Sequence, residues 1–276
     1  MVDKIYLNAY AKINLSLHIE NKRLDGFHNI ESLITFTNLH DEVFIKFSDK
    51  SNLSYTGEFK PNSKYFKDDI ILKVLKDLQI KKKLFISIKK NIPTKSGLAS
   101  ASTNAASLIK GLEKLNLIKK KNIATYSRFG SDIPACLYSK NCFIKGTGDK
   151  INKKVVFKKF YIILIKPKVS LSTKKMYEKF DKLESRKFNF KNDNNKLMNK
   201  SIFQNDFEKI ARYENKEIND ILNYMTNLEK CKFARMTGSG SCCYAVFTNK
   251  TQASEAFESI EKKYKTLWKF FGTNIK

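Results

Sequence analysis

Residues 91–112 read NIPTKSGLASASTNAASLIKGL, a loop of small residues that leads into a segment with apolar residues at helical spacing. The run before it, KLFISIKK at 83–90, alternates as a β-strand does. A helix that begins at about Ser102 would present backbone N–H groups at its N-terminus, where phosphate binds readily. The loop has neither the Gly-Lys-Ser/Thr of a Walker loop nor the G-x-G-x-x-G of a dinucleotide site. Taken alone, it is also compatible with an ordinary strand-to-helix turn.

The composition favours a folded protein. The 276 residues are 42% hydrophobic and 12% aromatic, enough for the core of one large domain or two small ones. The first twenty residues alternate as a strand does, and no apolar run approaches the roughly 18 residues of a membrane span. We therefore expect a soluble, cytoplasmic protein without a membrane partner.

The formal net charge of +26 is compatible with nucleic-acid binding. Nearly all the basic residues are lysines spread along the chain, and only five are arginines, whose forked side chains nucleic-acid sites favour. The pattern favours a generally basic surface, which would attract anionic phosphates, over a dedicated nucleic-acid partner.

The cysteines and histidines do not indicate a zinc site. The five cysteines form no CxxC pair, and none of the three histidines is spaced with a cysteine or carboxylate as a zinc cage requires. We expect reduced core thiols in a reducing compartment.

The order of the patterns predicts the fold class. Strand-like runs at 6–20, 31–39 and 41–48 are followed by a helical pattern at 68–80. Later strands and helices are mixed rather than strictly alternating, which predicts an α+β fold in two lobes that divide near residue 157. The polar segment 181–200 is interpreted as a mobile insertion.

Five segments together resemble the GHMP family of small-molecule kinases, and the resemblance covers about residues 5 to 272. It implies an ATP-binding and catalytic lobe at 1–157, of the α/β type found in a ribosomal protein. It also implies a ferredoxin-like α+β lobe at 158–276 that completes the substrate site. The segments are AYAKINLSLHI (9–19), RLDGFHNIESLITFTNLHDEV (23–43), NIPTKSGLASASTNAA (91–106), GSDIPACLY (130–138) and RMTGSGSCCYAVF (235–247).

Within that family, AKINLSL combined with DGFH and GSDIP resembles the kinases that act on cytidine diphosphate-methylerythritol. The resemblance implies transfer of the γ-phosphoryl group of ATP, with Mg²⁺, to the 2-hydroxyl of that substrate in non-mevalonate isoprenoid (terpenoid) biosynthesis. A monomer or a homodimer is expected.

Two residues match the catalytic positions of the family. The resemblance implies that Asp132 is the base that orients the attacking hydroxyl and that Lys12 lies beside it. A cation within about 4–6 Å keeps such a carboxylate ionised and helps to neutralise the transferring phosphoryl group. The alternative is that Asp132 caps the turn before Pro134 and that Lys12 extends along a strand edge.

The resemblance also implies the substrate site. Asn14 and His28 are expected to hold polar groups of the substrate, and we propose that Phe27 and Tyr177 sandwich the cytosine. The family usually has tyrosine at the position of Phe27, so a phenolic hydrogen bond is lost here. Asn205 and Asp206 match a late polar motif that supports the site, whereas His18 and His40 are expected to be structural.

The loop is implied to bind the ATP triphosphate, with Ser102 as the candidate ligand of Mg²⁺. The erythritol kinases have GLGGGS where this chain has GLASAS, so a positive φ at residues 99 to 101 would cost roughly 1–2 kcal/mol. The loop TGSGS at 237–241 is expected to close against the first lobe, or else to be a hairpin-like turn. The predicted ATP-binding residues are Pro93, Thr94, Lys95, Ser96, Gly97, Leu98, Ala99, Ser100, Ala101, Ser102 and Thr103.

Three alternatives stay open at this point. GLASAS is closer to the loop of diphosphomevalonate decarboxylases, so a mevalonate-like substrate is one alternative. A basic RNA-binding homologue without kinase activity is the second, and a degenerate homologue is the third. Retention of Lys12 and Asp132 speaks against the degenerate homologue.

Overall fold

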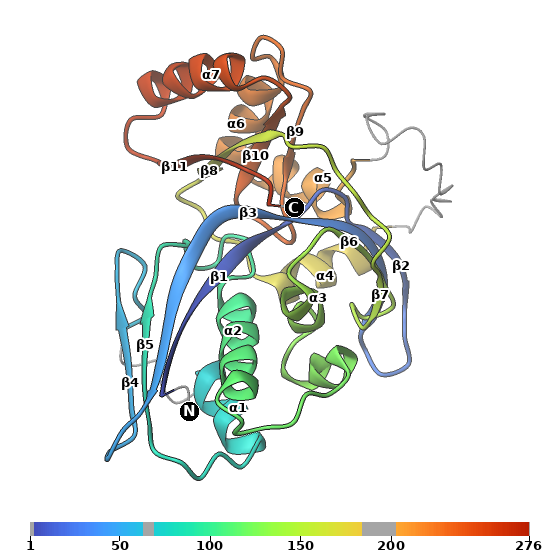
Figure 1. Ribbon diagram of the computed structural model, residues 1–276. Coiled ribbons are helices and arrows are strands. Elements are labelled where there is room, and N and C mark those ends of the chain that lie inside the picture. The colour runs from blue at the N-terminus through green and yellow to red at the C-terminus, as the bar shows by residue number, and fades with distance from the viewer. Residues whose placement is uncertain (1–2, 63–68, 184–202, 276) are drawn as a thin grey trace. The chain divides into compact units, whose positions relative to one another are not determined.

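The computed structural model describes residues 3–62, 69–183 and 203–275 (Figure 1). Its contacts divide the chain into two units, each assembled from separated segments. Unit 1 holds the described residues of 1–12, 39–94 and 99–139, and unit 2 holds those of 13–38, 95–98 and 140–276. Strands β1 (Lys4–Asn14) and β3 (His28–Phe47) both contribute residues to each unit. The single boundary near residue 157 stays a prediction.

The sheet of unit 1 is built around the second half of β3. That half pairs antiparallel with β5 (Leu84–Lys89), so that Glu42 lies opposite Lys89, and β4 (Asn52–Thr56) pairs parallel with β5. The runs expected as two strands at 31–39 and 41–48 form one strand of 20 residues. No glycine or proline separates the two runs, so nothing in the sequence interrupts the extended backbone.

Helix α2 is the central helix of unit 1. Its apolar residues Ala105, Leu108, Ile109 and Leu112 are almost completely buried. A Cβ on Gly111 would lie 2.4 Å from the side chain of Ile45, so the glycine lets α2 approach β3 closely. The helices of this unit are α1 (Ile70–Asp77), α2 (Ser100–Lys114), the 3-10 helix η2 (Ile123–Phe129) and α3 (Ile133–Tyr138).

Unit 2 contains a second sheet, which is four-stranded and entirely antiparallel in the order β11-β8-β10-β9. The first half of β3 also belongs to this unit, where it pairs with β2 and β6, and β6 pairs with β7. The strands are β2 (His18–Lys22), β6 (Cys142–Lys145), β7 (Lys150–Asn152), β8 (Tyr161–Lys166), β9 (Phe233–Met236), β10 (Cys243–Phe247) and β11 (Trp268–Thr273).

Two helices cover one face of the four-stranded sheet (Figure 1). Ile163 and Ile165 of β8 and Ala245 of β10 share a buried cluster with Ile221 of α6 and Ile260 of α7. Alternate residues of a strand point to the same face, so these contacts place both helices on one side. These two helices are α6 (Lys216–Thr226) and α7 (Lys250–Lys263). Unit 2 also contains α4 (Thr173–Asp181) and α5 (Asp206–Glu214).

The predicted α+β class is confirmed, because strands and helices are mixed in both units. Among the helices of the described ranges, none combines the length and the apolar character that crossing a membrane requires. Most of the segment interpreted as a mobile insertion, residues 184–200, lies outside the described residues.

Candidate active site

Lys12 and Asp132 form an ion pair in unit 1. The Nζ of Lys12 donates to Oδ1 of Asp132 at 2.6 Å, across 120 positions of sequence. Asp132 is the residue before α3, but its side chain makes no capping hydrogen bond to that helix. The alternative in which Asp132 only caps the turn is therefore wrong. Lys12 is 3% exposed, so the alternative in which its side chain only extends from a strand edge into solvent is wrong as well.

The loop reaches its helix through a left-handed alanine. Ala99 has φ 56° and ψ 30°, and α2 begins at Ser100, two residues before the expected start. Among residues 99 to 101, only Ala99 adopts a positive φ. Alanine has no side-chain acceptor, so it makes no capping hydrogen bond to the first N–H groups of α2. Uncapped N–H groups at a helix N-terminus are a suitable anion site.

The three hydroxyl groups at the start of α2 have different surroundings. The hydroxyl of Ser100 donates to Asp41 at 2.9 Å, and that of Thr103 donates to the carbonyl of Ser100 at 3.0 Å. Both side chains are buried, whereas Ser102 is half-buried. Ser102 is therefore the hydroxyl of the three that is best placed to reach a ligand.

In unit 2, Gly97 lies directly against the loop at 237–241. The hydroxyl of Thr237 donates to the carbonyl of Gly97 at 3.4 Å, and the N–H of Cys242 donates to the carbonyl of Ser96 at 3.0 Å. Gly97 has φ 77°, and a Cβ there would lie 2.2 Å from the carbonyl oxygen of Thr237. Only glycine fits at this position of the predicted phosphate loop.

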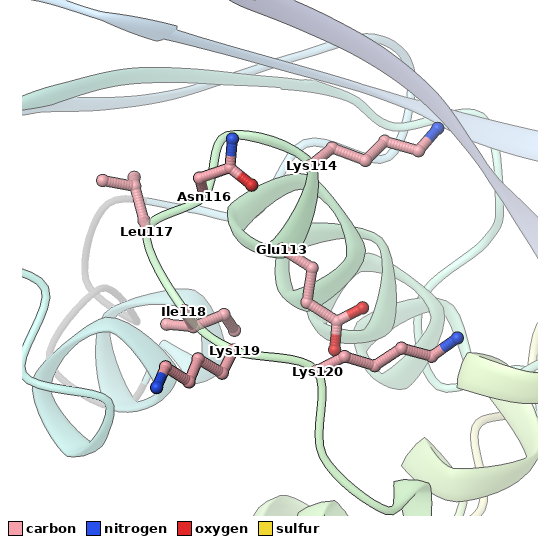
Figure 2. Close-up of a pocket in the computed structure, with 7 residues that line it drawn as sticks. All are labelled: Glu113, Lys114, Asn116, Leu117, Ile118, Lys119 and Lys120. Carbon is pink, nitrogen blue, oxygen red and sulfur yellow. The ribbon is translucent and has the colours of Figure 1, made fainter.

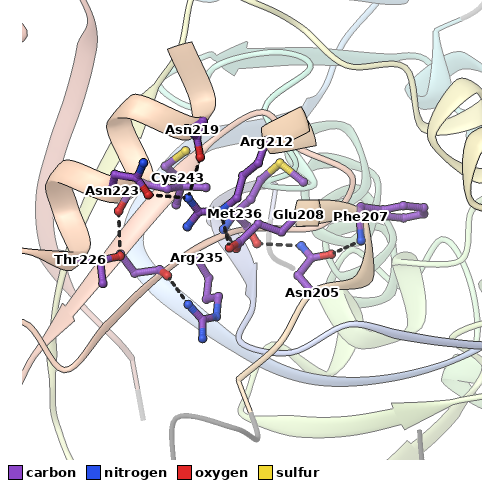
Figure 3. Close-up of polar contacts among 12 residues, drawn as sticks. Asn205, Phe207, Glu208, Arg212, Asn219, Asn223, Thr226, Arg235, Met236 and Cys243 are labelled. Carbon is purple, nitrogen blue, oxygen red and sulfur yellow. Dashed lines mark hydrogen bonds and ion pairs between the residues drawn. The ribbon is translucent and has the colours of Figure 1, made fainter. Parts of the chain in front are cut away.

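Asn14 and Asn205 hold the same loop in unit 2. The backbone N–H of Asn14 donates to the Thr237 hydroxyl at 3.0 Å, and its side-chain amide donates to Ser32 at 2.7 Å. The amide of Asn205 donates to the carbonyl of Met236 at 2.7 Å (Figure 3). It also donates to the carbonyl of Gly238 at 2.8 Å. The backbone N–H of Asn14 and the side-chain amide of Asn205 together hold the start of this loop.

A glutamate reinforces this arrangement. Glu208 accepts the N–H of Met236 at 2.8 Å with one oxygen and Arg212 Nε at 3.0 Å with the other (Figure 3). Asp206, the other residue of the expected supporting motif, accepts the N–H of Ile19 at 2.7 Å. The sequence analysis named Asn205 and Asp206 but not Glu208. The spacing of Glu208 and Arg212, four residues apart on a helix, was the signal that could have indicated it.

His28 is part of a polar and aromatic cluster in unit 2. Its Nε2 lies 2.6 Å from Oδ1 of Asp181, and the other oxygen of Asp181 accepts Lys22 Nζ at 2.6 Å. Lys22 and then His28 hold the pKa of Asp181 below its usual range. The ring of His28 stacks on Tyr177 with centroids 4.6 Å apart. Phe27 is 64% exposed, so its ring has room for a ligand.

The predicted site residues are thus distributed over both units. Lys12, Asp132 and most of the loop residues belong to unit 1, whereas Asn14, Phe27, His28 and Tyr177 belong to unit 2. Sequence reasoning missed Asp181, because the residue stands at the start of a segment interpreted as a polar insertion. His40, expected to be structural, packs edge-on against Tyr10.

A surface cavity of about 670 Å³ lies at the opposite end of α2 (Figure 2). Its lining includes Glu113 and Lys114 at the end of the helix and Lys119 in the following loop. None of the predicted site residues lines it, so it carries no part of the predicted chemistry.

The described residues contain no group of three or more His, Cys, Asp or Glu that could hold a metal ion.

Two family models match the chain. The model for the GHMP kinases N-terminal domain matches residues 65–140, and the model for the GHMP kinases C-terminal domain matches residues 189–266. The matches lie on either side of the predicted boundary near residue 157.

Curated relatives match over nearly the whole length. A 4-diphosphocytidyl-2-C-methyl-D-erythritol kinase from Clostridium tetani is 32% identical over 95% of this chain and 98% of its own. The enzyme of the same name from Pelagibacter ubique is 34% identical, with 95% and 96% covered.

Solved structures share the fold. A 4-(cytidine 5'-diphospho)-2C-methyl-D-erythritol kinase superposes with a TM-score of 0.82 at 20% identity, covering 99% of this chain and 100% of the other. A homoserine kinase from Cytophaga hutchinsonii gives 0.69 at 17%, covering 100% and 95%. A mevalonate pyrophosphate decarboxylase from Streptococcus pyogenes gives 0.66 at 11%, covering 99% and 97%. The two-lobed fold expected from the resemblance is therefore confirmed.

Proposed function

The chain belongs to the GHMP kinases, and within them to the 4-diphosphocytidyl-2-C-methyl-D-erythritol kinases; on that premise we propose its reaction. It transfers the γ-phosphoryl group of ATP to the 2-hydroxyl of 4-diphosphocytidyl-2-C-methyl-D-erythritol, giving ADP and the 2-phosphate. The step belongs to non-mevalonate isoprenoid biosynthesis. The observation that carries the proposal is the 2.6 Å pair of Lys12 and Asp132, two residues that match the catalytic positions of the family.

Asp132 acts as the base in this proposal. Its carboxylate accepts the proton of the attacking hydroxyl, and Lys12 stabilises the ionised carboxylate and the charge of the transferring group. Phosphoryl transfer depends mostly on positioning and charge stabilisation, so two such groups meet its main requirement.

The loop that precedes α2 binds the triphosphate in this proposal. Three observations support the assignment: the uncapped helix N-terminus after Ala99, the small side chains around it, and the exposure of Thr94 and Lys95. Mg²⁺ would be held by Ser102 together with phosphate oxygens, because this ion is usually bound by only one or two protein groups in phosphate sites. When bound, it would neutralise charge on the phosphates.

The substrate's cytidine binds in unit 2 in this proposal, at Asn14, Phe27, His28 and Tyr177. The hydrogen bond of His28 to Asp181 fixes the orientation of the imidazole. Phe27 offers an exposed ring for stacking on the cytosine.

The other activities are not favoured. The decarboxylase that resembles this chain in structure shares 11% identity, a level at which only the fold is common. The RNA-binding alternative rests on the net charge and on a type of lobe that also occurs in a ribosomal protein, and neither of these specifies an RNA site. The degenerate alternative would leave the close pairing of Lys12 and Asp132 without a purpose.

Cytoplasmic localisation is part of the proposal, because the reaction draws on the cytoplasmic pool of ATP. The five cysteines are free thiols, as suits a reducing compartment. The partners are then ATP and the cytidylated substrate, for a monomer or a homodimer.

The direct test measures ADP release and phosphorus NMR of the product with purified protein, ATP and Mg²⁺. One sample contains the cytidylated alcohol and a parallel sample contains mevalonate 5-diphosphate. We expect turnover and a new phosphomonoester signal in the first sample alone. Turnover in the second sample alone would overturn the assignment.

A further inference from the structure

A buried ionic cluster lies in unit 1, apart from Lys12 and Asp132. Its members are Asp41 of β3, Lys90 just after β5, and Ser100 at the start of α2, which are 0%, 4% and 9% exposed. Lys90 Nζ donates to Oδ2 of Asp41 and to the hydroxyl of Ser100. The Ser100 hydroxyl in turn donates to the same carboxylate oxygen at 2.9 Å.

The other oxygen of Asp41 binds the chain just before the predicted phosphate loop. Its Oδ1 accepts the backbone N–H groups of Asn91 and Ile92 at 2.7 and 2.8 Å. One carboxylate therefore holds the residues on both sides of the stretch 93–99: the two N–H groups before it and Ser100 after it. The backbone of Lys90 is itself held by the N–H that it donates to Thr56 at 2.8 Å.

The conformation of Ala99 explains why the start of α2 needs hydrogen bonds from outside the helix. In most helices the residue before the first turn carries a side chain that fixes the chain where it enters the helix. Ala99 has none, and it adopts a left-handed conformation that is unfavourable for alanine. The hydrogen bonds of Ser100 hold the first residue of α2 in its place instead.

The cluster is unsuited to act through charge. Asp41 neutralises Lys90, so the pair adds no net charge near the N-terminus of α2. Burial lowers the pKa of Lys90, and the charge of Asp41 opposes this shift. Buried ion pairs contribute little net stability compared with apolar residues of similar size. The geometry that the cluster imposes is therefore its distinctive contribution.

We propose that Asp41, Lys90 and Ser100 are positioning residues for ATP: they fix residues 91–92 and 100, at the two ends of the loop 93–99, where binding of the triphosphate requires them. The inference rests on the proposed assignment of this loop to ATP. It adds Asp41 and Lys90 to the residues on which ATP affinity depends. It also assigns the Ser100 side chain a positioning role, through its hydrogen bonds with Asp41 and Lys90.

The test compares Ser100→Ala with Ser107→Ala. Ser107 is a buried serine of the same helix outside the cluster. Calorimetry measures the Kd of an unreactive ATP analogue with Mg²⁺ and, separately, the Kd of the cytidylated alcohol. We expect Ser100→Ala to weaken analogue binding about fivefold, the usual value of one hydrogen bond, and to leave binding of the alcohol unchanged. Ser107→Ala should leave both values unchanged.

Two further variants separate positioning from a general loss of structure. Ser100→Thr keeps the hydroxyl and should restore the affinity for the analogue to near that of the parent protein. Asp41→Asn should weaken analogue binding more than Ser100→Ala, since it alters the contacts on both sides of the loop. Circular dichroism and the Tm are measured for each variant. If Asp41→Asn does not fold, the comparison of Ser100→Ala with Ser100→Thr tests the inference.

The inference is overturned if Ser100→Ala binds the analogue as tightly as the parent protein. It is also overturned if both ligands lose affinity equally, or if Ser107→Ala weakens analogue binding as much. Analogue binding does not require turnover. A parent protein that binds the analogue but transfers no phosphate to the cytidylated alcohol would refute the proposed function, and the two serine variants would still decide this inference.

Discussion

Asp132 is 34% exposed through its side chain, whereas the side chain of Lys12, with which it pairs, is 3% exposed. The cation is buried, and the carboxylate reaches solvent. A purely structural ion pair has no need of this asymmetry, but a base that must meet a substrate hydroxyl does. The buried lysine holds the carboxylate from behind and leaves its outer face accessible.

Replacing Asp132 with asparagine should abolish the base and keep the shape of the side chain. We expect kcat to fall by roughly 10²–10⁴, the range usual for a general base, with the KM of both substrates nearly unchanged. Asp77→Asn is the matched control, because Asp77 is a half-exposed carboxylate of the same unit, paired with Arg128. Steady-state ADP release measures both variants. A kcat near the parent value in Asp132→Asn would remove this residue from the mechanism.

Tyr177→Ala should weaken binding of the cytidylated substrate. The ring of Tyr177 stacks on His28 and meets Phe207 edge-on at 4.9 Å, so its loss removes a stacking surface and releases His28. We expect the KM of that substrate to rise about tenfold, with the KM of ATP unchanged, because base–aromatic stacking contributes roughly 1–3 kcal/mol. Tyr213, which is 93% exposed, provides the control Tyr213→Ala. Equal effects of Tyr177→Ala on the two KM values would refute the cytosine site.

The sequence predicted the parts of the site that short segments encode. Lys12, Asp132 and Gly97 are predicted because each stands inside a segment that resembles the GHMP kinases, and their roles stay predictions. The Asp41–Lys90 pair could not be predicted, because its partners are 49 residues apart and meet only through the pairing of β3 with β5. The same holds for Asp181, whose partner His28 is 153 residues away. Local patterns do not specify such long-range pairings, which depend on the complete fold.

The start of α2 shows a second limit. The helix is expected to begin at about Ser102, yet it begins at Ser100, whose hydroxyl donates to Asp41. A contact with a residue 59 positions away thus accompanies the first residue of the helix, and the local pattern does not contain that contact.

Alkaline pH should destabilise the protein through Cys242. Burial raises the pKa of this thiol from the usual 9.0 to about 12. Between these two pH values the unfolded chain releases the proton and the folded chain keeps it, so stability falls as pH rises. The loss from this thiol should reach about 1 kcal/mol by pH 10. Urea unfolding at pH 8 and pH 10 measures it, and Cys242→Ala should show a smaller loss than the parent protein. An identical loss in both proteins would contradict the expectation.

Ala99→Gly and Ala101→Gly should change stability in opposite directions, although the two alanines are two residues apart. Ala99 has φ 56°, where a Cβ is unfavourable by roughly 1–2 kcal/mol, so glycine relieves strain in the folded state. Glycine also gives the unfolded chain more freedom, which offsets about 0.4–1 kcal/mol of that gain. We therefore expect Ala99→Gly to raise the free energy of unfolding by about 0.5 kcal/mol. Ala101 is exposed and lies inside α2, where glycine costs roughly 0.5–1 kcal/mol relative to alanine.

Urea unfolding of both variants at one temperature tests this difference, and the KM of ATP is measured alongside. Because the cluster of Asp41 and Ser100 already holds the loop in place, relieving the strain at Ala99 should leave the KM of ATP within about twofold, less than the fivefold change expected from one lost hydrogen bond. A lower stability of Ala99→Gly would show that residue 99 does not adopt the left-handed conformation in solution. A large fall in the KM of ATP would instead show that strain at Ala99 limits binding, and that the GLASAS loop binds ATP more weakly than a glycine-rich one.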